Sequence, residues 1–340
     1  MSYLPFYRIS PALLNQLTRA TELRQWIANA TVDVSWLPAL QKDTAARLAH
    51  SSTAIEGNPL SLKEVRLLSR GDSVRAQDKS RKEVLDYLNA LAWIENQPAA
   101  SGMTEKKLLF LHEKLTQQTL ATGQSGCYKS RPNRIVDGRG YTVYTPPPPK
   151  VVKKLTRELL EWINETLEEK SHPLIVSSIA HHRLVSIHPF MDGNGRISRV
   201  LAIWVLYTRG FDSRHLFALD EYFETDRHRY YDKIQQVREL DQDLTGWLEY
   251  TAEGLVDALE KTRQRIESLQ IQSRDSRLVL TRRQEELLRF IRERGKVGSL
   301  EICRAFQLTR SRVNQIVKPL VVASILSREG STRATVYKIT

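Results

Sequence analysis

The sequence contains few cysteines and no long apolar run, and each absence excludes a class of protein. Only Cys127 and Cys303 occur among 340 residues. Two cysteines do not make a disulfide framework, so we expect a cytoplasmic protein in which both are small buried apolar side chains. No stretch approaches the roughly 20 apolar residues of a membrane-spanning helix, and the N-terminus lacks a charged segment followed by an apolar one. We therefore expect neither a membrane span nor a secretory signal.

The length and the charge distribution point to more than one domain. Hydrophobic residues make up 41% and charged residues 26% of the chain, which is typical of a globular protein with two or three domains. The net charge is +12, and residues 271–340 hold 15 Lys or Arg against 6 Asp or Glu. Nine of the twelve net positive charges therefore fall in the last fifth of the chain. This asymmetry predicts a separate module with an anionic partner.

Apolar residues at helical spacing predict that most of the chain is helical. The expected helices include residues 104–120, 151–169, 173–187 and 245–270. Thr104 is a suitable N-cap for the first of them, and Pro173 is suited to the first turn of the third. The last helix leads into the polar stretch 272–277, where we place a domain boundary.

One segment breaks the helical pattern. Strand-forming residues 134–136 and 141–144 flank the pair Asp137-Gly138, which is typical of a tight turn between two strands. Four prolines, residues 146–149, then end the second strand. The segment therefore predicts a short β-hairpin.

The stretch from His188 to Arg199 reads HPFMDGNGRISR and is the most informative part of the sequence. Pro189 disfavours helical geometry in the residue before it, so the helix over 173–187 is expected to end here. The glycines of Gly193-Asn194-Gly195 can adopt positive φ, which lets backbone N–H groups converge. A new helix starting near Gly195 would add the N–H groups of its first turn. The loop is therefore expected to bind an anion.

The side chains around this loop fit phosphate chemistry. Arg196 and Arg199 are three residues apart on one helical face, so both can reach phosphates. Asp192 supplies a hard oxygen ligand for Mg²⁺ bound to phosphates. His188 is expected to titrate near neutral pH, as a general base acting on a hydroxyl should. The alternative is a plain loop with a core histidine and two surface arginines, but it leaves the clustering of these groups unexplained.

This stretch resembles the motif HxFx(D/E)GNGRxxR of the Fic family at every fixed position. The resemblance implies a mainly α fold, a Fic helical core with a short β-hairpin flap, and a protein adenylyltransferase that moves AMP from ATP to a Ser, Thr or Tyr hydroxyl. It implies that His188 deprotonates the hydroxyl and that Asp192 holds Mg²⁺. It also implies phosphate contacts from Gly193, Asn194, Gly195, Arg196 and, at the terminal phosphate, Arg199.

A second match lies far upstream, where residues 52–58 read STAIEGN. Ser52 and Glu56 are four residues apart on one helical face, and Gly57 is suited to a helix C-cap. A carboxylate in the last turn of a helix gains from a cationic partner. The segment resembles the Fic inhibitory motif, (S/T)xxxE(G/N), which implies that the partner of Glu56 is Arg199 and that ATP then binds unproductively. The alternative is a solvated glutamate at a helix end.

Three further features resemble the family less specifically. Residues 126–131 resemble a G-x-Y-R segment, with Lys129 where arginine is usual. The predicted hairpin resembles a flap that docks a target segment as an added strand, with a plain surface hairpin as the alternative. Tyr230 and Tyr231 resemble an aromatic pair near the adenine, Tyr231 being the expected contact, although core packing would explain tyrosines at helical spacing equally well.

The C-terminal segment 280–340 predicts three helices and a hairpin and resembles a winged helix-turn-helix, a small α+β domain. The expected helices are 283–294, 299–306 and one that begins at Thr309, and the expected strands are 325–328 and 334–339. The third helix would present Arg310, Arg312, Asn314 and Gln315, which are residue types that pair with base edges of DNA. Arg328 and Arg333 would lie on the wing. The alternative is a winged helix used for dimerisation or protein contact.

The sequence thus predicts an N-terminal helical region with an inhibitory helix (1–104), a Fic catalytic core (105–255), a linker helix (256–278) and a winged-helix domain (279–340). Two other functions stay open: Fic-type transfer of another nucleotide or removal of AMP, and a nucleotide-sensing regulator that binds DNA. The target protein, which includes the chain itself as a candidate, and the formation of a homodimer are left open as well.

Overall fold

The computed structural model describes residues 3–32, 36–98, 102–121, 123–136, 138–169, 171–272, 280–322, 325–330 and 335–339. The chain divides into two compact units, residues 1–27 with 40–263 and residues 28–39 with 264–340. The four-part division predicted from the sequence stays a prediction, and most of its expected boundary at 272–277 lies outside the described residues.

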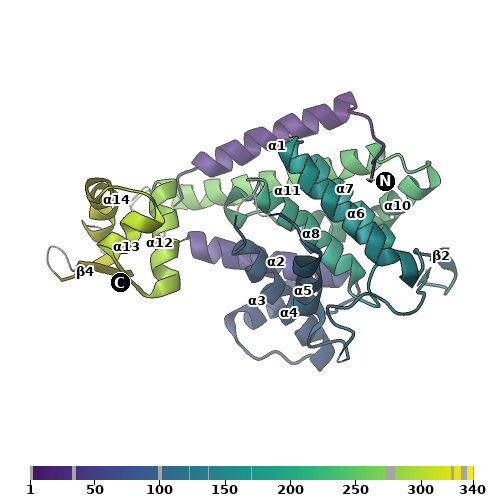
Figure 1. Ribbon diagram of the computed structural model, residues 1–340. Helices are drawn as coiled ribbons and strands as arrows, with labels where there is room; N and C mark the ends of the chain where they lie inside the picture. Colours follow the sequence, from purple (N-terminus) through teal and green to yellow (C-terminus); the bar gives the residue numbers. More distant parts are fainter. Residues whose placement is uncertain are drawn as a thin grey trace. The chain divides into compact units, whose positions relative to one another are not determined.

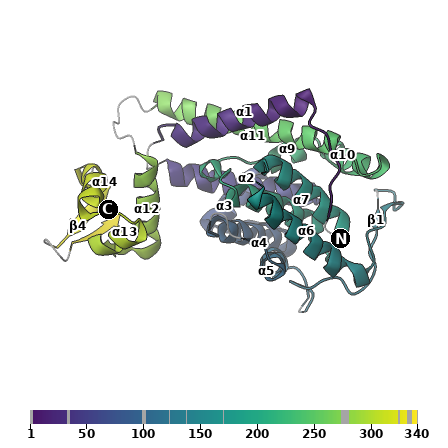
Figure 2. The ribbon, with the colours of Figure 1, turned by 45° about the horizontal axis from the view of Figure 1, so that its top comes forward.

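The mainly α prediction is confirmed (Figures 1 and 2). The helices before residue 273 are α1 (Pro11–Asn29), α2 (Leu37–Ile55), α3 (Leu62–Arg70), α4 (Asp78–Glu95), α5 (Glu105–Thr116), α6 (Pro149–Glu168), α7 (Pro173–Ile187), α8 (Asn194–Thr208), α9 (Asp220–Thr225), α10 (Arg227–Glu239) and α11 (Thr245–Gln272). In both views the purple helix α1 runs alongside the green helix α11. No helix among the described residues is long and apolar enough to cross a membrane.

The core of the first unit is built around α7 and α8, which pack against each other. Nearly every side chain of both helices is buried, as expected for helices that are apolar on all faces. Pro173 occupies the first turn of α7, and the imidazole of His172 accepts the Leu174 N–H. The predicted helix over 173–187 is confirmed, and its C-terminal end places His188 at the start of the loop to α8.

Helix α5 begins as predicted but ends earlier. Thr104 caps it by accepting the Lys107 N–H on its side-chain oxygen. The helix stops at Thr116 instead of residue 120 because the Gln118 backbone N–H and side-chain amide both donate to the Asp86 carboxylate of α4. A carboxylate on a neighbouring helix therefore ends α5, and helical spacing within the segment does not reveal it.

The expected burial of both cysteines is wrong for Cys127, which is exposed. The backbone is held on either side of it, where Gly126 donates its N–H to His112 and Lys129 donates its N–H to the Pro189 carbonyl. Cys127 lies between these two hydrogen-bonded residues and is exposed to solvent, whereas the Lys129 side chain is buried. Cys303 is half-buried and packs against the core of the second unit.

The predicted hairpin is present as β1 (Ile135–Val136) and β2 (Thr142–Tyr144), which pair antiparallel. Ile135 lies opposite Tyr144 and Val136 opposite Thr142, with a register shift between the two pairs. Val136 and Val143 are exposed, so this short ribbon shows apolar side chains to solvent. Asp137, predicted in the turn, lies outside the described residues.

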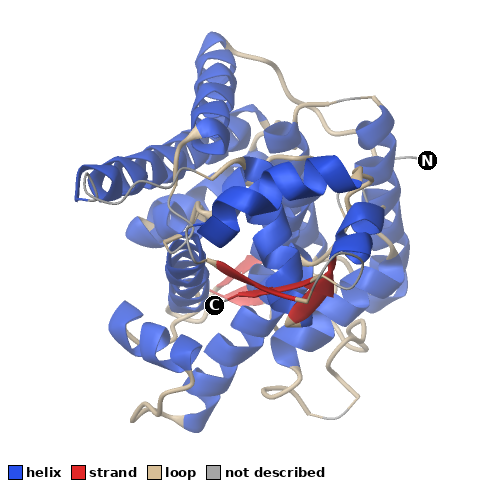
Figure 3. Cartoon of the chain, turned by 90° about the vertical axis from the view of Figure 1, so that its left-hand side faces the viewer, coloured by secondary structure: helices blue, strands red, loops and turns tan. Residues whose placement is uncertain are grey.

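The second unit contains the three predicted helices, the predicted hairpin and one unpredicted strand. Its elements are α12 (Arg282–Arg294), β3 (Lys296–Gly298), α13 (Ser299–Ala305), α14 (Arg310–Val322), β4 (Leu326–Glu329) and β5 (Val336–Ile339). The strands form an antiparallel sheet in the order β3-β5-β4, drawn in red in Figure 3. Strand β3 was missed because three residues are too few for a period-of-two pattern. Arg333 lies outside the described residues.

Candidate active site

The loop between α7 and α8 is held in shape by its own residues. His188 adopts a left-handed conformation (φ 51°) and donates its N–H to the Leu184 carbonyl, which closes α7. Asn194, predicted to bind phosphate, is buried, and its side-chain amide both accepts the Phe190 N–H and donates to the Phe190 carbonyl, each at 2.9 Å. Gly193 has φ 77°, and a Cβ there would lie 2.9 Å from the Thr116 methyl group. The loop therefore requires glycine at 193 and is braced internally by Asn194.

His188 is a neutral base with a free nitrogen. Its Nδ1 lies 3.2 Å from the Val185 carbonyl oxygen, which can only accept, so Nδ1 carries the proton and Nε2 keeps its lone pair. The pKa of His188 is lowered to about 4, mainly by burial and in smaller part by the Lys129 ammonium, whereas the Val185 bond and the Glu56 carboxylate oppose the shift. The expected titration near neutral pH is therefore wrong for the free chain. At pH 7 the imidazole is therefore neutral, with the lone pair on Nε2.

Lys129 connects the segment before the hairpin to this loop. Its side chain is only 3% exposed, and its Nζ donates to Asn133 Oδ1 at 2.7 Å. Asn133 in turn donates to the Phe190 carbonyl at 3.1 Å. Burial lowers the pKa of Lys129 to about 8. The residue that departs from the family pattern thus places a cation near His188.

Arg196 is a buried cation with open donors. It is 4% exposed, and its Nε and Nη1 have no hydrogen-bond partner within the part of the chain that the structure describes. Its Nη2 lies 3.8 Å from Asp192 Oδ1, an ion pair at the limit of contact. A buried guanidinium with unpaired N–H groups is costly to hold, and an anion at this position would relieve that cost.

Asp192 offers a carboxylate suited to a phosphate-bound Mg²⁺. Its side chain is 54% exposed, and Oδ1 accepts the Gly193 N–H at 2.6 Å. The described residues contain no cluster of three His, Cys, Asp or Glu side chains that would hold a metal ion alone. Mg²⁺ commonly binds through one or two carboxylates, with phosphate oxygens and waters completing the shell. The residues present therefore fit a metal that enters with phosphates and do not form an all-protein cage.

Arg199, in contrast, is fully buried and surrounded by acceptors. Nε donates to Ser52 Oγ at 2.7 Å, and Nη2 donates to the Ser52 carbonyl and to Glu56 Oε1, both at 2.8 Å. Nη1 reaches the Tyr230 hydroxyl at 3.4 Å, and the buried Asp220 carboxylate lies 3.9 Å from Nε. The structure thus brings Ser52 and Glu56 together with Arg199 across almost 150 residues of sequence.

The Glu56 carboxylate lies against the start of α8. Helix α2 ends at Ile55, so Glu56 is one residue beyond it and not in its last turn as expected, and Gly57 follows with φ 92°. A Cβ added at Gly195 would overlap the Glu56 carboxylate and lie 3.2 Å from Arg199 Nη1. Glycine at 195 therefore gives an anion access to the N-terminus of α8, and Glu56 occupies that position.

The two predicted adenine-side tyrosines differ in their surroundings. Tyr230 is buried, and its hydroxyl contacts His181 Nε2 at 3.0 Å as well as Arg199. Tyr231 is 40% exposed, and its hydroxyl lies 3.4 Å from the Ile55 carbonyl at the end of α2. Tyr230 therefore supports Arg199, and the adenine contact assigned to Tyr231 stays a prediction.

The sequence analysis missed His112 and Asp220. The His112 ring stacks on Phe190 with centroids 3.7 Å apart. Its Nδ1 accepts the Gly126 N–H, so Nε2–H donates to the Asp192 carbonyl at 3.0 Å. Burial lowers the pKa of His112 to about 4, which keeps this arrangement neutral. Both residues are single side chains on helices with no motif around them, and no sequence signal marks them.

The predicted base-reading residues lie in the second unit. Arg310, Arg312, Asn314 and Gln315 are all exposed in the first turns of α14. Thr309 accepts the Arg312 N–H on its side-chain oxygen, as expected of an N-cap, and Arg312 Nη1 donates to Gln315 Oε1 at 2.8 Å. Two of the four residues are therefore hydrogen-bonded to each other.

Solved structures share the fold. A Fic family protein from Desulfovibrio desulfuricans G20 superposes with a TM-score of 0.69 at 24% identity, over 99% of this chain and 98% of that one. Fic-1 (residues 134–508) from C. elegans superposes with a TM-score of 0.62 at 22% identity, over 77% of this chain and 74% of that one.

Curated relatives and a protein family match in sequence. Protein adenylyltransferase Fic of Nematostella vectensis is 27% identical over 196 residues, 55% of this chain and 42% of that protein. Protein adenylyltransferase Fic of Aedes aegypti is 28% identical over 213 residues, 60% of this chain and 39% of that protein. The chain thus spans less than half the length of these relatives. Residues 102–206, which include the loop from His188 to Arg199, match the Fic/DOC family. This part of the chain is therefore similar to the Fic/DOC family.

Proposed function

We propose that this protein is an adenylyltransferase that transfers AMP from ATP to a side-chain hydroxyl of a protein, and that Glu56 restrains it. The observation that carries the proposal is the presence, in one loop, of a buried cation with unpartnered N–H groups and a neutral imidazole with a free lone pair. Arg196 is buried with two unpartnered nitrogens among the described residues, and His188 at the other end of the same loop has a free Nε2. The relatives named as protein adenylyltransferases support the same activity.

The chemistry follows from these positions. The target hydroxyl oxygen attacks the α-phosphorus of ATP, and its proton passes to Nε2 of His188. The bond from the α-phosphorus to the bridging oxygen breaks, and pyrophosphate leaves with the electron pair. The backbone N–H groups at the start of α8 and the Arg196 guanidinium stabilise charge on the phosphates, so catalysis rests on positioning and electrostatics.

We propose Asp192 as the residue that would hold Mg²⁺ together with the phosphates. The ion would supply charge neutralisation on the phosphate oxygens. His112 positions this residue, because its Nε2–H fixes the Asp192 carbonyl and leaves the carboxylate facing solvent.

The restraint by Glu56 is a competition between anions. The Glu56 carboxylate lies where the terminal phosphate of ATP would meet Arg199 and the start of α8. The Glu56 carboxylate and the terminal phosphate would repel each other strongly if both contacted the Arg199 guanidinium. ATP would then bind with its phosphates displaced, and transfer would be slow until α2 moves or Glu56 is replaced.

The test is transfer of radiolabel from α-labelled ATP to protein by the parent, Glu56→Gly and Glu56→Gln. We expect Glu56→Gly to gain label at least tenfold and Glu56→Gln to gain less, since glutamine keeps the bulk but loses the charge. Glu239→Gly is the matched control, because this glutamate is exposed at the end of α10. Label that does not rise in Glu56→Gly would exclude the restraint, and no label in any variant would exclude the transferase.

The alternative activities, transfer of another nucleotide and removal of AMP, can be tested with the same assay. Replacing ATP by labelled UTP or GTP distinguishes transfer of another nucleotide, and an AMP-modified target distinguishes AMP removal, in which Glu56 would position water. We also propose the cytoplasm as the site of action, which is supported by the two unpaired cysteines.

A second candidate function is DNA binding by the second unit. It is favoured by the four exposed DNA-suited side chains at the start of α14 and by the excess of basic residues after position 270. This function would coexist with AMP transfer, because the two sets of residues do not overlap.

A further inference from the structure

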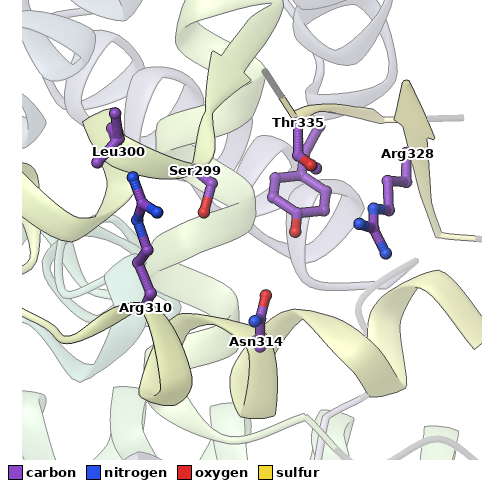
Figure 4. Close-up of a pocket in the computed structure, with 7 residues that line it drawn as sticks. Ser299, Leu300, Arg310, Asn314, Arg328 and Thr335 are labelled. Atoms are coloured by element: carbon purple, nitrogen blue, oxygen red, sulfur yellow. The ribbon is translucent and has the colours of Figure 1, made fainter. Parts of the chain in front are cut away.

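The second unit contains a pocket of about 200 Å³ between the start of α13, the first turns of α14 and strands β4 and β5. The side chains that line it include Ser299, Arg310, Asn314, Arg328, Thr335 and Tyr337. Figure 4 shows Arg310 and Arg328 on opposite sides of the pocket, with Asn314 between them on α14. The volume has room for one phosphate group and a few waters of about 30 Å³ each.

The lining is cationic and rich in donors. Each of the six side chains named above carries an N–H or O–H group, and no carboxylate lines the pocket in the described part of the chain. Arg310 and Arg328 form no ion pair with any described residue. The nearby Glu329 is instead held by Lys296 and Lys338, at 2.8 and 2.7 Å. The pocket therefore holds two positive charges that no described residue of the unit neutralises.

We propose that this pocket takes one backbone phosphate of double-stranded DNA. Arg310 and Asn314 then position the duplex and do not read its bases, whereas Arg312 and Gln315, which lie outside the pocket lining, are left for the base edges. DNA is favoured over a small phosphate ligand because the pocket opens beside exposed residues of α14 suited to base edges. The inference rests on the proposed DNA binding.

The test measures binding of the full chain to a fluorescein-labelled duplex of random sequence by fluorescence anisotropy, over a series of salt concentrations. We expect the double variant Arg310→Ala/Arg328→Ala to bind at least tenfold more weakly and to reduce the slope of log affinity against log salt by about 1. Arg292→Ala is the matched control, an exposed arginine on α12 outside the pocket, and we expect it to change affinity less than twofold.

A second measurement separates positioning from base reading. In selection from a random-sequence pool, the parent and the double pocket variant are expected to enrich the same sequences. Arg312→Ala is expected to enrich different ones, because it removes a candidate base contact. A changed preference in the pocket variant would overturn the assignment of the pocket to a backbone phosphate.

The remaining outcomes distinguish failure of the proposed DNA binding from failure of the pocket assignment. If the parent binds no duplex, the proposed DNA binding and the pocket assignment both fail. If the parent binds and the pocket variant binds equally well, only the pocket assignment fails. If ATP or inorganic phosphate raises the melting temperature in an Arg310- and Arg328-dependent manner and no duplex binds, the pocket holds a small phosphate ligand and the DNA assignment is wrong.

Discussion

The two compact units hold their arginines under opposite conditions. In the first unit Arg199 is fully buried, and Ser52, Glu56 and Tyr230 accept its hydrogen bonds. In the second, Arg310 and Arg328 are exposed and have no ion-pair partner among the described residues. A buried arginine whose N–H groups are already accepted, as in Arg199, takes a ligand only by exchanging an acceptor that the chain provides, so its binding depends on the state of the chain. An exposed arginine exchanges water and salt ions, so its binding depends on ionic strength.

Helix α8 also contains two arginines that differ, although both are buried. Arg196 and Arg199 are three residues apart and both buried, yet Arg196 has two nitrogens without a partner in the described structure and Arg199 has an acceptor for each nitrogen. Burial alone therefore does not distinguish a structural cation from a ligand-binding one. The distinction lies in which hydrogen bonds are already made.

The largest effect is expected at the base. His188→Ala, made in the Glu56→Gly background, should lower the initial rate of AMP transfer about 10²- to 10⁴-fold, because it removes the proposed general base. The control is His228→Ala in the same background, an exposed histidine that should leave the rate unchanged. Equal rates for the two variants would show that the proposed mechanism is wrong.

The contrast between the α8 arginines predicts unequal effects of their replacement on stability. Arg199→Met should lower the free energy of unfolding by about 3 kcal/mol, because it leaves the buried Asp220 carboxylate without its cation. Arg196→Met should lower it little or not at all, because it removes an unpaired buried charge. Urea unfolding followed by tryptophan fluorescence reports mainly on the first unit, since five of the six tryptophans belong to it. Equal decreases in the free energy of unfolding for the two variants would contradict the proposed difference between the two side chains.

Ionic strength should affect the proposed duplex binding of the second unit much more than the proposed AMP transfer of the first. Between 50 and 200 mM salt, duplex binding should weaken about fortyfold if three phosphates are contacted. AMP transfer by Glu56→Gly should change less than twofold over the same range, because buried charges are poorly screened. Anisotropy and label transfer measured in matched buffers test this, and parallel salt dependences would contradict it.

The smallest effect concerns Lys129. Its ammonium lowers the pKa of His188, so Lys129→Gln should move that pKa upward from about 4, toward the ordinary value of 6.5. The proposed base would act in its neutral form, which is populated above its pKa, so the acid limb of kcat/KM against pH should move to higher pH. Both proteins are compared in the Glu56→Gly background, with the exposed Lys63→Gln as control. An unmoved limb would exclude an electrostatic role for Lys129.

Local signals account for what could be predicted. Pro173 and Pro189 delimit α7, Thr104 and Thr309 cap their helices, and the glycines after Asp192 predict the loop to α8, because each acts on its own few residues of backbone. The hairpin was predicted for the same reason. The early end of α5, strand β3 and the exposure of Cys127 were not, since each depends on a hydrogen bond or strand partner far along the chain.

The sequence by itself determined the helices, the hairpin and the set of groups available for phosphate chemistry, because spacing and turn residues act locally. Only the tertiary structure decided the state of those groups. It buries His188 beside Lys129 and so lowers its pKa, and it completes the hydrogen bonds of Arg199. Among the described residues, it leaves two nitrogens of Arg196 without a partner and gives Arg310 and Arg328, which line one pocket, no counter-charge. The physical reason is that the energy of a charge depends on its desolvation and on its neighbours, and these come from distant parts of the chain.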